Sequence, residues 1–262
     1  MSVRPGAEPY AYDGDDLGVL LCHGFTSNPA SLRPWAESIA AAGHTVRLPR
    51  LPGHGTTWRE MGRTTWAQWY DELDTAFAEL RARSRVVVVG GLSMGGGLAL
   101  RLAEQHPADG SVDSAGVDAL VLVNPAVRVD DPRLKALPVV RWLVPWLPPV
   151  GNDIKKPGVI EDAYDKIPPH AVHSMLAGYR TVVADLPAVK QPVLLFRSPQ
   201  DHVVPASSSA QILDRISSTD AEEVLLEDSF HVATLDNDAP MIFNRTLSFI
   251  NRIAGSTAGG QS

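Results

Sequence analysis

Short apolar runs alternate with amphipathic stretches along most of the 262-residue chain. The apolar runs are rich in valine and leucine, which is typical of strands buried on both faces of a parallel sheet. The stretches between them place apolar residues at helical spacing. This alternation predicts an α/β fold, a mostly parallel sheet with helices on both faces. The predicted strands are residues 17–22, 45–49, 86–90, 119–123, 193–197 and 223–226, and the predicted helices are 29–42, 65–83, 95–106, 207–216 and 241–253.

The stretch 128–171 breaks this rhythm. It has many prolines, two tryptophans and no clear strand pattern. A structureless loop of that length is unusual inside a compact domain, so an inserted cap is expected instead. The predicted organisation is therefore a core formed by residues 1–127 and 172–262, with residues 128–171 as a cap insertion.

The sequence GLSMG at residues 91–95 stands between an apolar run and the start of a helix. A G-x-S-x-G pattern in a strand–turn–helix setting is typical of a nucleophile elbow, in which the serine is held in a strained backbone conformation. Glycines at 91 and 95 remove side chains that would collide there. The alternative is a glycine-rich turn with an idle serine. We predict that Ser93 is a nucleophile.

A serine nucleophile needs a histidine base and an acid that orients it. Asp201 follows the predicted strand 193–197, and His231 follows the strand 223–226. Carboxyl ends of parallel strands meet at one sheet edge, so Ser93, Asp201 and His231 are expected on three loops of that edge. Their chain order, acid before histidine, is that of the α/β-hydrolases.

Other acids compete with Asp201 for the same role. Asp228 lies only three residues before His231, and an acid on a neighbouring loop reaches the far ring nitrogen more easily, which favours Asp201. Asp236 and Asp238 precede the last predicted helix and are interpreted as caps of its first turn. His202, next to Asp201, is interpreted as a solvated loop residue.

Stabilising an oxyanion takes two backbone donors. One is expected from the N–H of Met94, directly after the nucleophile, and the other from the N–H of Phe25, on the loop after the strand 17–22. Gly24 lets the backbone turn there. His23 precedes the serine, against the order expected of the base, and is interpreted as a residue that fixes this loop.

Composition and charge argue against several classes of protein. A net charge of −7 and a pI near 5.6 disfavour a nucleic-acid partner. The single cysteine, Cys22, agrees with a reducing compartment. No apolar signal-peptide core precedes the first strand, and the apolar stretch 136–150 is too broken to span a bilayer, so no transmembrane segment and a cytoplasmic enzyme are expected. His170 and His173 lack nearby partner ligands, and neither a metal nor an organic cofactor is expected.

Several stretches together resemble the bacterial monoacylglycerol lipases and the small carboxylesterases close to them. The resemblance implies an α/β-hydrolase core with a small cap, hydrolysing the ester bond of monoacylglycerols to give glycerol and a fatty acid. It implies Ser93, Asp201 and His231 as the triad, with Phe25 and Met94 as oxyanion donors. The stretches are HGFT at 23–26, LPRLPGHGT at 48–56, GLSMGG at 91–96, DHVVP at 201–205 and HVATLD at 231–236.

Two parts of the predicted cap are expected to contact the substrate or a lipid surface. The sequence PGVIEDAY at 157–164 is similar to the family pattern, in which an acid corresponding to Glu161 faces the glycerol end of the substrate. A carboxylate accepts hydrogen bonds from vicinal hydroxyls, although a solvated surface position explains Glu161 equally well. Trp142, Leu143 and Trp146 are expected either to cover the acyl tunnel and touch a lipid surface transiently, or to pack as the core of the cap.

The chain departs from the family pattern in the loop after His106 and in the proline-rich and tryptophan-rich part of the cap. Alternatives to a monoacylglycerol lipase are a broad carboxylesterase or an acyltransferase that uses the same acyl-enzyme. A ligand-binding protein on a hydrolase fold is the alternative outside catalysis, although such a protein usually lacks a triad member.

Overall fold

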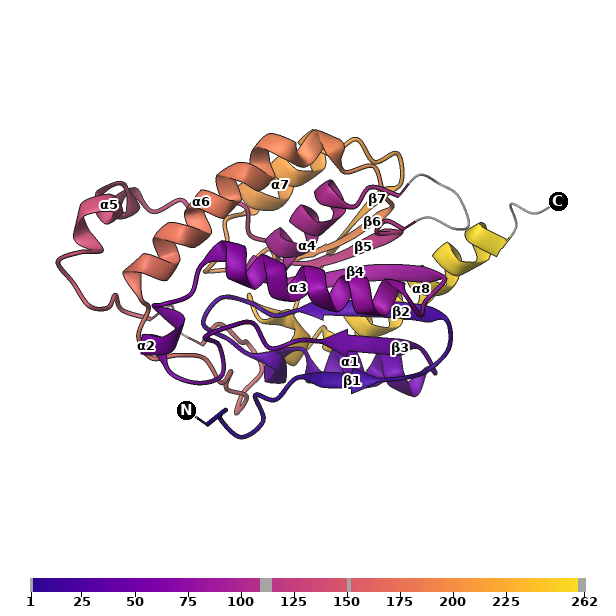
Figure 1. The fold of residues 1–262 in the computed structure, drawn as a ribbon, viewed down its shortest axis with the longest axis horizontal. Helices are drawn as coiled ribbons and strands as arrows, with labels where there is room; N and C mark the ends of the chain where they lie inside the picture. The colour runs from indigo at the N-terminus through magenta and orange to yellow at the C-terminus, as the bar shows by residue number, and fades with distance from the viewer. Residues whose placement is uncertain (1, 109–114, 150–151, 259–262) are drawn as a thin grey trace.

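The computed structural model describes residues 2–108, 115–149 and 152–258, and residues 109–114, in the loop after His106, lie outside it. A seven-stranded sheet with the order β1-β3-β2-β4-β5-β6-β7 runs through the molecule, parallel throughout except for β1 (Figure 1). The predicted α/β-hydrolase fold class is confirmed. The strands are β1 Tyr10–Tyr12, β2 Leu17–Cys22, β3 Thr45–Leu48, β4 Val86–Leu92, β5 Ala119–Val123, β6 Val193–Arg197 and β7 Ala221–Leu225.

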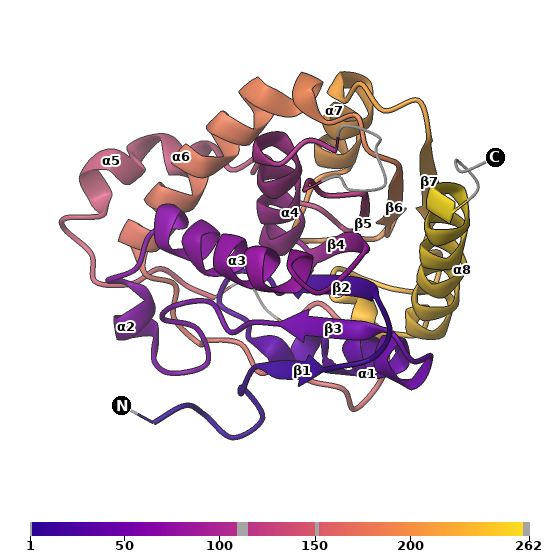
Figure 2. The ribbon, with the colours of Figure 1, turned by 45° about the vertical axis from the view of Figure 1, so that its right-hand side comes forward.

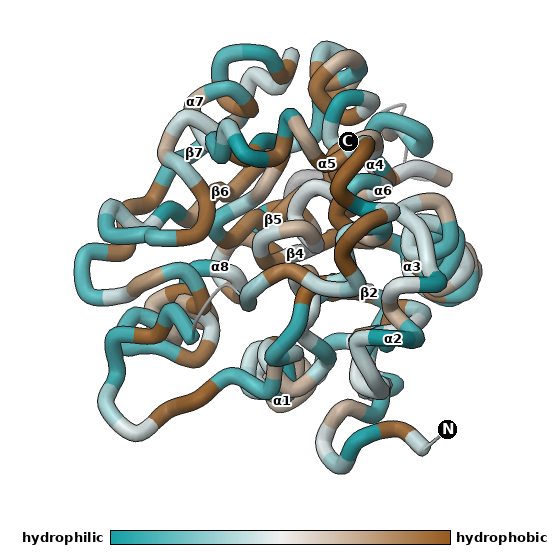
Figure 3. The backbone as a smooth tube through the Cα atoms, turned by 90° about the vertical axis from the view of Figure 1, so that its left-hand side faces the viewer, coloured by the Kyte–Doolittle hydropathy of each residue, from teal (hydrophilic) through white to brown (hydrophobic). Residues whose placement is uncertain are grey.

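The central strands are apolar because both of their faces are covered. Every residue of β2, β4 and β5 is buried. In the register of the ladder, Cys22 of β2 lies opposite Gly91 of β4, and Leu92 lies opposite Val123 of β5. The carboxyl ends of these strands are therefore level, and the loops that follow them emerge together. Figure 3 looks toward this edge, with the hydrophobic strands at the centre and mostly hydrophilic loops around them.

Helices cover the two faces of the sheet with separate apolar cores (Figures 1 and 2). On one face, α1 and α8 bury Trp35 and Phe249. On the other, α3, α4, α6 and α7 bury Trp69, Leu98 and Ile212. The helices are α1 Arg33–Ala41, α2 Trp58–Met61, α3 Trp66–Arg81, α4 Met94–Gln105, α5 Leu137–Val140, α6 Pro169–Asp185, α7 Ala206–Arg215 and α8 Ala239–Ala258.

Several elements differ from the sequence prediction, and the one-turn helix α2 is among those that were not predicted. The helix expected at 29–42 is divided into a 3-10 turn, Pro29–Ser31, and α1, because Asn28 caps the turn and a second start follows at Arg33. The strand β1 was not predicted, since it is three residues long and partly exposed at the sheet edge. Helix α6 was missed because it begins with prolines, which suit the first turn of a helix but suggest a loop in sequence.

Residues 128–171, called here the cap segment, contain a 3-10 turn, Pro132–Ala136, the helix α5 and an isolated bridge between Leu147 and Ile167. The segment extends beyond the carboxyl ends of the parallel strands, at the left of Figure 1. It ends inside the first turn of α6, which continues into the core. Within the described residues, no helix is both long enough and apolar enough to cross a bilayer.

Candidate active site

Ser93 occupies the turn between β4 and α4 with φ 56° and ψ −121°. A positive φ is costly for a residue with a Cβ and persists only where its surroundings enforce it. The N–H of Ser93 donates to the carbonyl of Val123 at 3.0 Å, and the N–H of Ala126 donates to the carbonyl of Ser93 at 3.0 Å. These bonds to the segment after β5 hold the strained residue in place.

The glycines on either side of Ser93 are required by close backbone contacts. A Cβ on Gly91 would lie 2.3 Å from the carbonyl carbon of Gly95. A Cβ on Gly95 would lie 2.0 Å from the carbonyl oxygen of Cys22. A side chain at Gly91 would therefore collide within the turn, and a side chain at Gly95 would collide with the end of β2.

His231 and Asp201 form a direct hydrogen bond, with Nδ1 of the ring 2.8 Å from Oδ2 of the carboxylate. The other oxygen of Asp201 accepts from the N–H groups of Val203 and Val204, each at 2.8 Å. Both side chains are buried, at 8% and 6% exposure. Asp228, on the same loop as His231, is exposed and pairs with Lys155 at 2.9 Å. The structure therefore brings Asp201 to His231 and leaves the competing Asp228 at the surface.

Asn124, directly after β5, connects the loops of this edge. Its Nδ2 donates to the carbonyl of His231 at 2.8 Å, and its Oδ1 accepts from the N–H of Ser198 at 2.7 Å. The hydroxyl of Ser198 donates in turn to the carbonyl of Phe230 at 2.8 Å. Asn124 has φ 43°, a conformation that asparagine tolerates better than most residues. Asn124 was not among the predicted site residues, because an asparagine after a strand is only a weak signal in a sequence.

The predicted oxyanion donors lie on the two segments beside Ser93. A Cβ built on Gly24 would lie 3.5 Å from the Cβ of Ser93, so the loop after β2 passes directly against the serine. Phe25 and Ser93 line the same cavity. Met94 is the first residue of α4, where backbone N–H groups have no partner within the helix.

His23 supports the donor loop. Its Nδ1–H donates to the carbonyl of Gly24 at 3.0 Å, and its Nε2 accepts from the N–H of Leu51 at 3.2 Å. Burial lowers the pKa of His23 to about 4, so the ring is neutral near pH 7. The carbonyl of Gly24 belongs to the same peptide group as the N–H of Phe25. A bond to that carbonyl therefore fixes the direction of the predicted donor.

A cavity of about 690 Å³, called here the Ser93 cavity, lies between the loops at the carboxyl ends of the strands and the cap segment. Ser93, His231 and Glu161 all line it. Glu161 accepts a hydrogen bond from Ser27 Oγ at 2.6 Å, and burial raises the pKa of its carboxyl. The solvated-surface interpretation of Glu161 is therefore wrong. Much of the remaining lining is apolar and comes from the cap segment and α6, including Leu134, Leu137, Val140, Val172, Met175 and Tyr179.

The outer face of the cap segment is also apolar. Trp142 is 71% exposed and Leu143 is 75% exposed, so the core-packing alternative is wrong for these two residues. Trp142 contacts the ring of His170, with 4.6 Å between ring centroids, and His173 accepts from Arg141. In the described part of the chain, no group of three or more His, Cys, Asp or Glu residues is placed to hold a metal ion.

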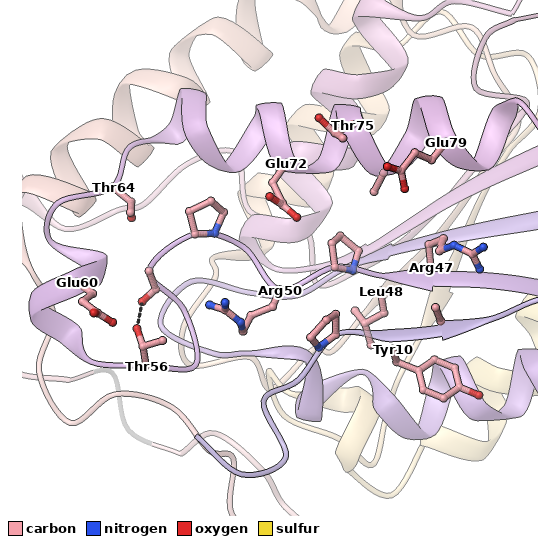
Figure 4. Close-up of a pocket in the computed structure, with 16 residues that line it drawn as sticks. Tyr10, Arg47, Leu48, Arg50, Thr56, Glu60, Thr64, Glu72, Thr75 and Glu79 are labelled. Carbon is pink, nitrogen blue, oxygen red and sulfur yellow. Dashed lines mark hydrogen bonds between the residues drawn. The ribbon is translucent and has the colours of Figure 1, made fainter. Parts of the chain in front are cut away.

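A second hollow of the same volume, about 690 Å³, lies between α3, the β1–β3 edge and the loop after β3 (Figure 4). We call it the Arg50 groove. Glu72 and Glu79 face it from α3, and Arg47 and Arg50 lie on the opposite side. Thr75 of α3 is also among the lining residues. The described residues that line it do not include Ser93 or its predicted partners. The groove is therefore separate from the chemistry predicted from sequence.

The parallel sheet, the strained serine between strand and helix, and the acid and histidine on later loops define the α/β-hydrolase class. A family model described as serine aminopeptidase, S33, matches residues 16–238. The chain belongs to this family.

Relatives of known activity match almost the whole chain. The thermostable monoacylglycerol lipase of Bacillus sp. (strain H-257) is 43% identical over 254 residues, covering 97% of this chain and 98% of that protein. The carboxylesterase of Bacillus subtilis (strain 168) is 22% identical over 250 residues, covering 94% of this chain and 97% of that protein. The resemblance to bacterial monoacylglycerol lipases and carboxylesterases is confirmed.

Solved structures agree with this relationship. A structure described with two metagenome-derived lipolytic enzymes, LipS and LipT, superposes with a TM-score of 0.91 at 41% identity, covering 96% of this chain and 100% of that chain. The monoglyceride lipase of Saccharomyces cerevisiae, in complex with a substrate analogue, superposes with a TM-score of 0.76 at 15% identity, covering 97% and 96% of the two chains. The second likeness shows the fold alone.

Proposed function

We propose that this protein is a serine hydrolase that cleaves monoacylglycerols to glycerol and fatty acid through an acyl-enzyme. The observation that carries the proposal is the 2.8 Å bond between Asp201 and His231, at a cavity that Ser93 also lines. The 43% identity to a bacterial monoacylglycerol lipase supports the choice of substrate.

The proposed reaction begins when His231 takes the proton of Ser93 and the serine oxygen attacks the ester carbonyl. Asp201 accepts from Nδ1, holds the ring in the required tautomer and stabilises the imidazolium that forms. The N–H groups of Phe25 and Met94 stabilise the oxyanion, each contributing about 3–4 kcal/mol in comparable sites. Glycerol leaves with the proton from His231, and water then releases the fatty acid by the same steps.

The proposed orientation of the substrate follows from the two ends of the cavity. Glu161 and Ser27 form a polar pair that can bond the free hydroxyls of a glycerol group. The apolar lining from α5 and α6 suits an acyl chain. A monoacylglycerol has both features, whereas a triacylglycerol has no free hydroxyl for the polar pair.

The test is a panel of mono-, di- and triacylglycerols and simple alkyl esters with one acyl chain, assayed with the wild type and Glu161→Gln. We expect the wild type to prefer monoacylglycerols. The variant should lose about tenfold in kcat/KM on them, while alkyl-ester hydrolysis stays within twofold, because only the hydroxyl contacts change.

Equal turnover across the wild-type panel would favour the broad carboxylesterase, an activity named for the Bacillus subtilis relative. Transfer of the acyl group to an added alcohol in preference to water would favour the acyltransferase.

We also propose that the protein is cytoplasmic and contacts lipid surfaces transiently. The exposed Trp142 and Leu143, with Ile160 at 79% exposure, give the cap segment an apolar face suited to transient contact with a lipid surface. The free, buried Cys22 agrees with a cytoplasmic location. Sedimentation with lipid vesicles tests the contact: Trp142→Ser should reduce the bound fraction, and unchanged binding would contradict it.

A further inference from the structure

Asp153, in the cap segment, bonds to both of the loops that carry the proposed acid and base. Its Oδ2 accepts from the N–H of His231 and from the N–H of His202, each at 3.1 Å. Its Oδ1 accepts from Nδ1 of His202 at 2.7 Å. Its backbone carbonyl accepts from the N–H of Val232 at 3.1 Å. One residue from outside the sheet thus links the neighbour of Asp201 to the backbone of His231.

The environment of Asp153 makes these bonds effective. Its side chain is only 12% exposed and lines the Ser93 cavity. A buried carboxylate that accepts several hydrogen bonds holds its donors in a narrow geometry, because each bond lost would leave a polar group without a partner. His202 is 62% exposed but is not a freely solvated loop residue, since its backbone and ring both bond to Asp153.

Asp236 attaches the same part of the cap segment to the His231 loop from the other side. Its carboxylate accepts from the N–H groups of Lys155 and Lys156 at 2.7 and 2.8 Å, and from the N–H of Phe230 at 2.9 Å. The interpretation of this side chain as a helix cap is therefore wrong, because its bonds go to the cap segment, the His231 loop and the N–H of Asn237, which precedes α8. With the ion pair between Lys155 and Asp228, residues 153–156 are tied to the His231 loop at three points.

We propose that Asp153 is a positioning residue, which sets the alignment of His231 with Asp201 and couples that alignment to the seating of the cap segment. The inference rests on the proposed function, because it assigns Asp153 a role through the acid–base pair. A displacement of about 1 Å in a reacting group can cost about a hundredfold in rate, so loss of the link should act on kcat.

The test compares Asp153→Ala, Asp153→Asn and a matched control, Asp228→Ala. Asp228 is a carboxylate of the His231 loop that pairs with Lys155 but does not bond to His231. All rates are expressed per active serine, titrated with a fluorophosphonate, so that misfolded protein does not count. We expect Asp153→Ala to lower kcat by about 10–100-fold with KM within twofold, and Asp228→Ala to leave kcat within twofold.

The conservative variant separates positioning from a general structural role. The amide oxygen of Asp153→Asn can still accept from the two backbone N–H groups, so kcat should recover to within about fivefold of the wild type. The downfield proton resonance of His231 Nδ1–H provides a second measurement, and it also covers the case in which the alanine variant folds poorly. We expect it to shift or broaden in Asp153→Ala, remain in Asp153→Asn and Asp228→Ala, and disappear in Asp201→Ala.

Three results would overturn the inference: a kcat within twofold per active serine in Asp153→Ala, a change in KM alone, or an unaltered His231 resonance. Failure of the proposed function is distinguishable from these, because a Ser93→Ala variant that retained activity would remove the acid–base mechanism itself. An inactive Ser93→Ala variant together with a normal Asp153→Ala variant would overturn only the positioning role.

Discussion

The Ser93 cavity and the Arg50 groove have the same volume, about 690 Å³, but different chemistry. The groove lies at the edge of the sheet, where charged side chains of α3 face arginines of β3 and the loop after it (Figure 4). The cavity lies at the carboxyl ends of the parallel strands, where loops from β2, β4 and β7 meet the cap segment. Volume alone therefore does not mark a functional site in this molecule.

The two hollows differ in how their polar groups are held. At the cavity, the carboxylate of Asp201 accepts from backbone N–H groups of its own loop. The backbones of His231 and Ser93 bond to Asn124 and Val123, at the end of β5. In the groove, Glu72, Thr75 and Glu79 project from the exposed side of one helix. Side chains locked by their neighbours can stabilise a transition state without reorganising, whereas solvated side chains cannot.

The largest expected effect comes from removing the acid of the cavity. Asp201→Asn should lower kcat/KM by about 10⁴-fold while leaving the fold intact, because an amide favours the wrong histidine tautomer. Steady-state ester hydrolysis measures the change. Asp228→Asn is the matched control, with an expected change below twofold. A loss confined to the Asp228 variant would reverse the assignment of the acid.

A smaller effect is expected when a tryptophan narrows the cavity, and none when a tryptophan is placed in the groove. Met175→Trp narrows the apolar part of the cavity and should lower kcat/KM for long-chain esters by about 10–100-fold, with little change for acetate esters, because fewer methylenes are buried. Thr75→Trp fills the groove and should leave both substrates within twofold. The comparison is measured by varying acyl length. A chain-length effect in Thr75→Trp would show that the groove also binds substrate.

The smallest expected effect concerns stability at a buried carboxyl outside both hollows. Glu104, near the carboxyl end of α4, accepts from Arg101 at 2.9 Å, and burial raises its pKa from 4.5 to about 8. The folded state therefore keeps a proton that the unfolded chain releases, and this group's contribution to stability falls as the pH rises from about 4.5 to about 8.

Glu104→Gln should remove that loss. Its free energy of unfolding should match the wild type near pH 5 and exceed it at pH 9 by on the order of 1–3 kcal/mol, with ester hydrolysis unchanged. Urea unfolding at both pH values provides the measurement. A variant less stable than the wild type at pH 9 would mean that the ion pair with Arg101 outweighs the cost of burial.

The features that could be predicted from the sequence are those that depend on a local pattern of residues. The apolar runs predicted six of the strands, and the pattern around Ser93 predicted its turn, because backbone strain and close packing require particular residues there. Asp201 was favoured over Asp228 because it lies on a neighbouring loop and not on the loop of His231, and the geometry of the pair supports this choice.

The features that the sequence did not reveal depend on contacts between distant segments. Asn124 bonds to a residue 107 positions away, and Asp153 to one 78 positions away. Neither has a local pattern, because a single asparagine or aspartate has the same appearance in any loop. The edge strand β1 and the helix α6 were missed for a related reason: pairing and packing, more than periodicity, stabilise them.

Covalent labelling tests the central claim most directly. The protein is titrated with a fluorophosphonate, the adduct is located by peptide mass mapping, and the remaining ester hydrolysis is measured at each step. One adduct on Ser93, with activity lost in proportion and no adduct in Ser93→Ala, is the predicted result. Full hydrolytic activity with Ser93 completely labelled, or with Ser93 replaced by alanine, would contradict the account.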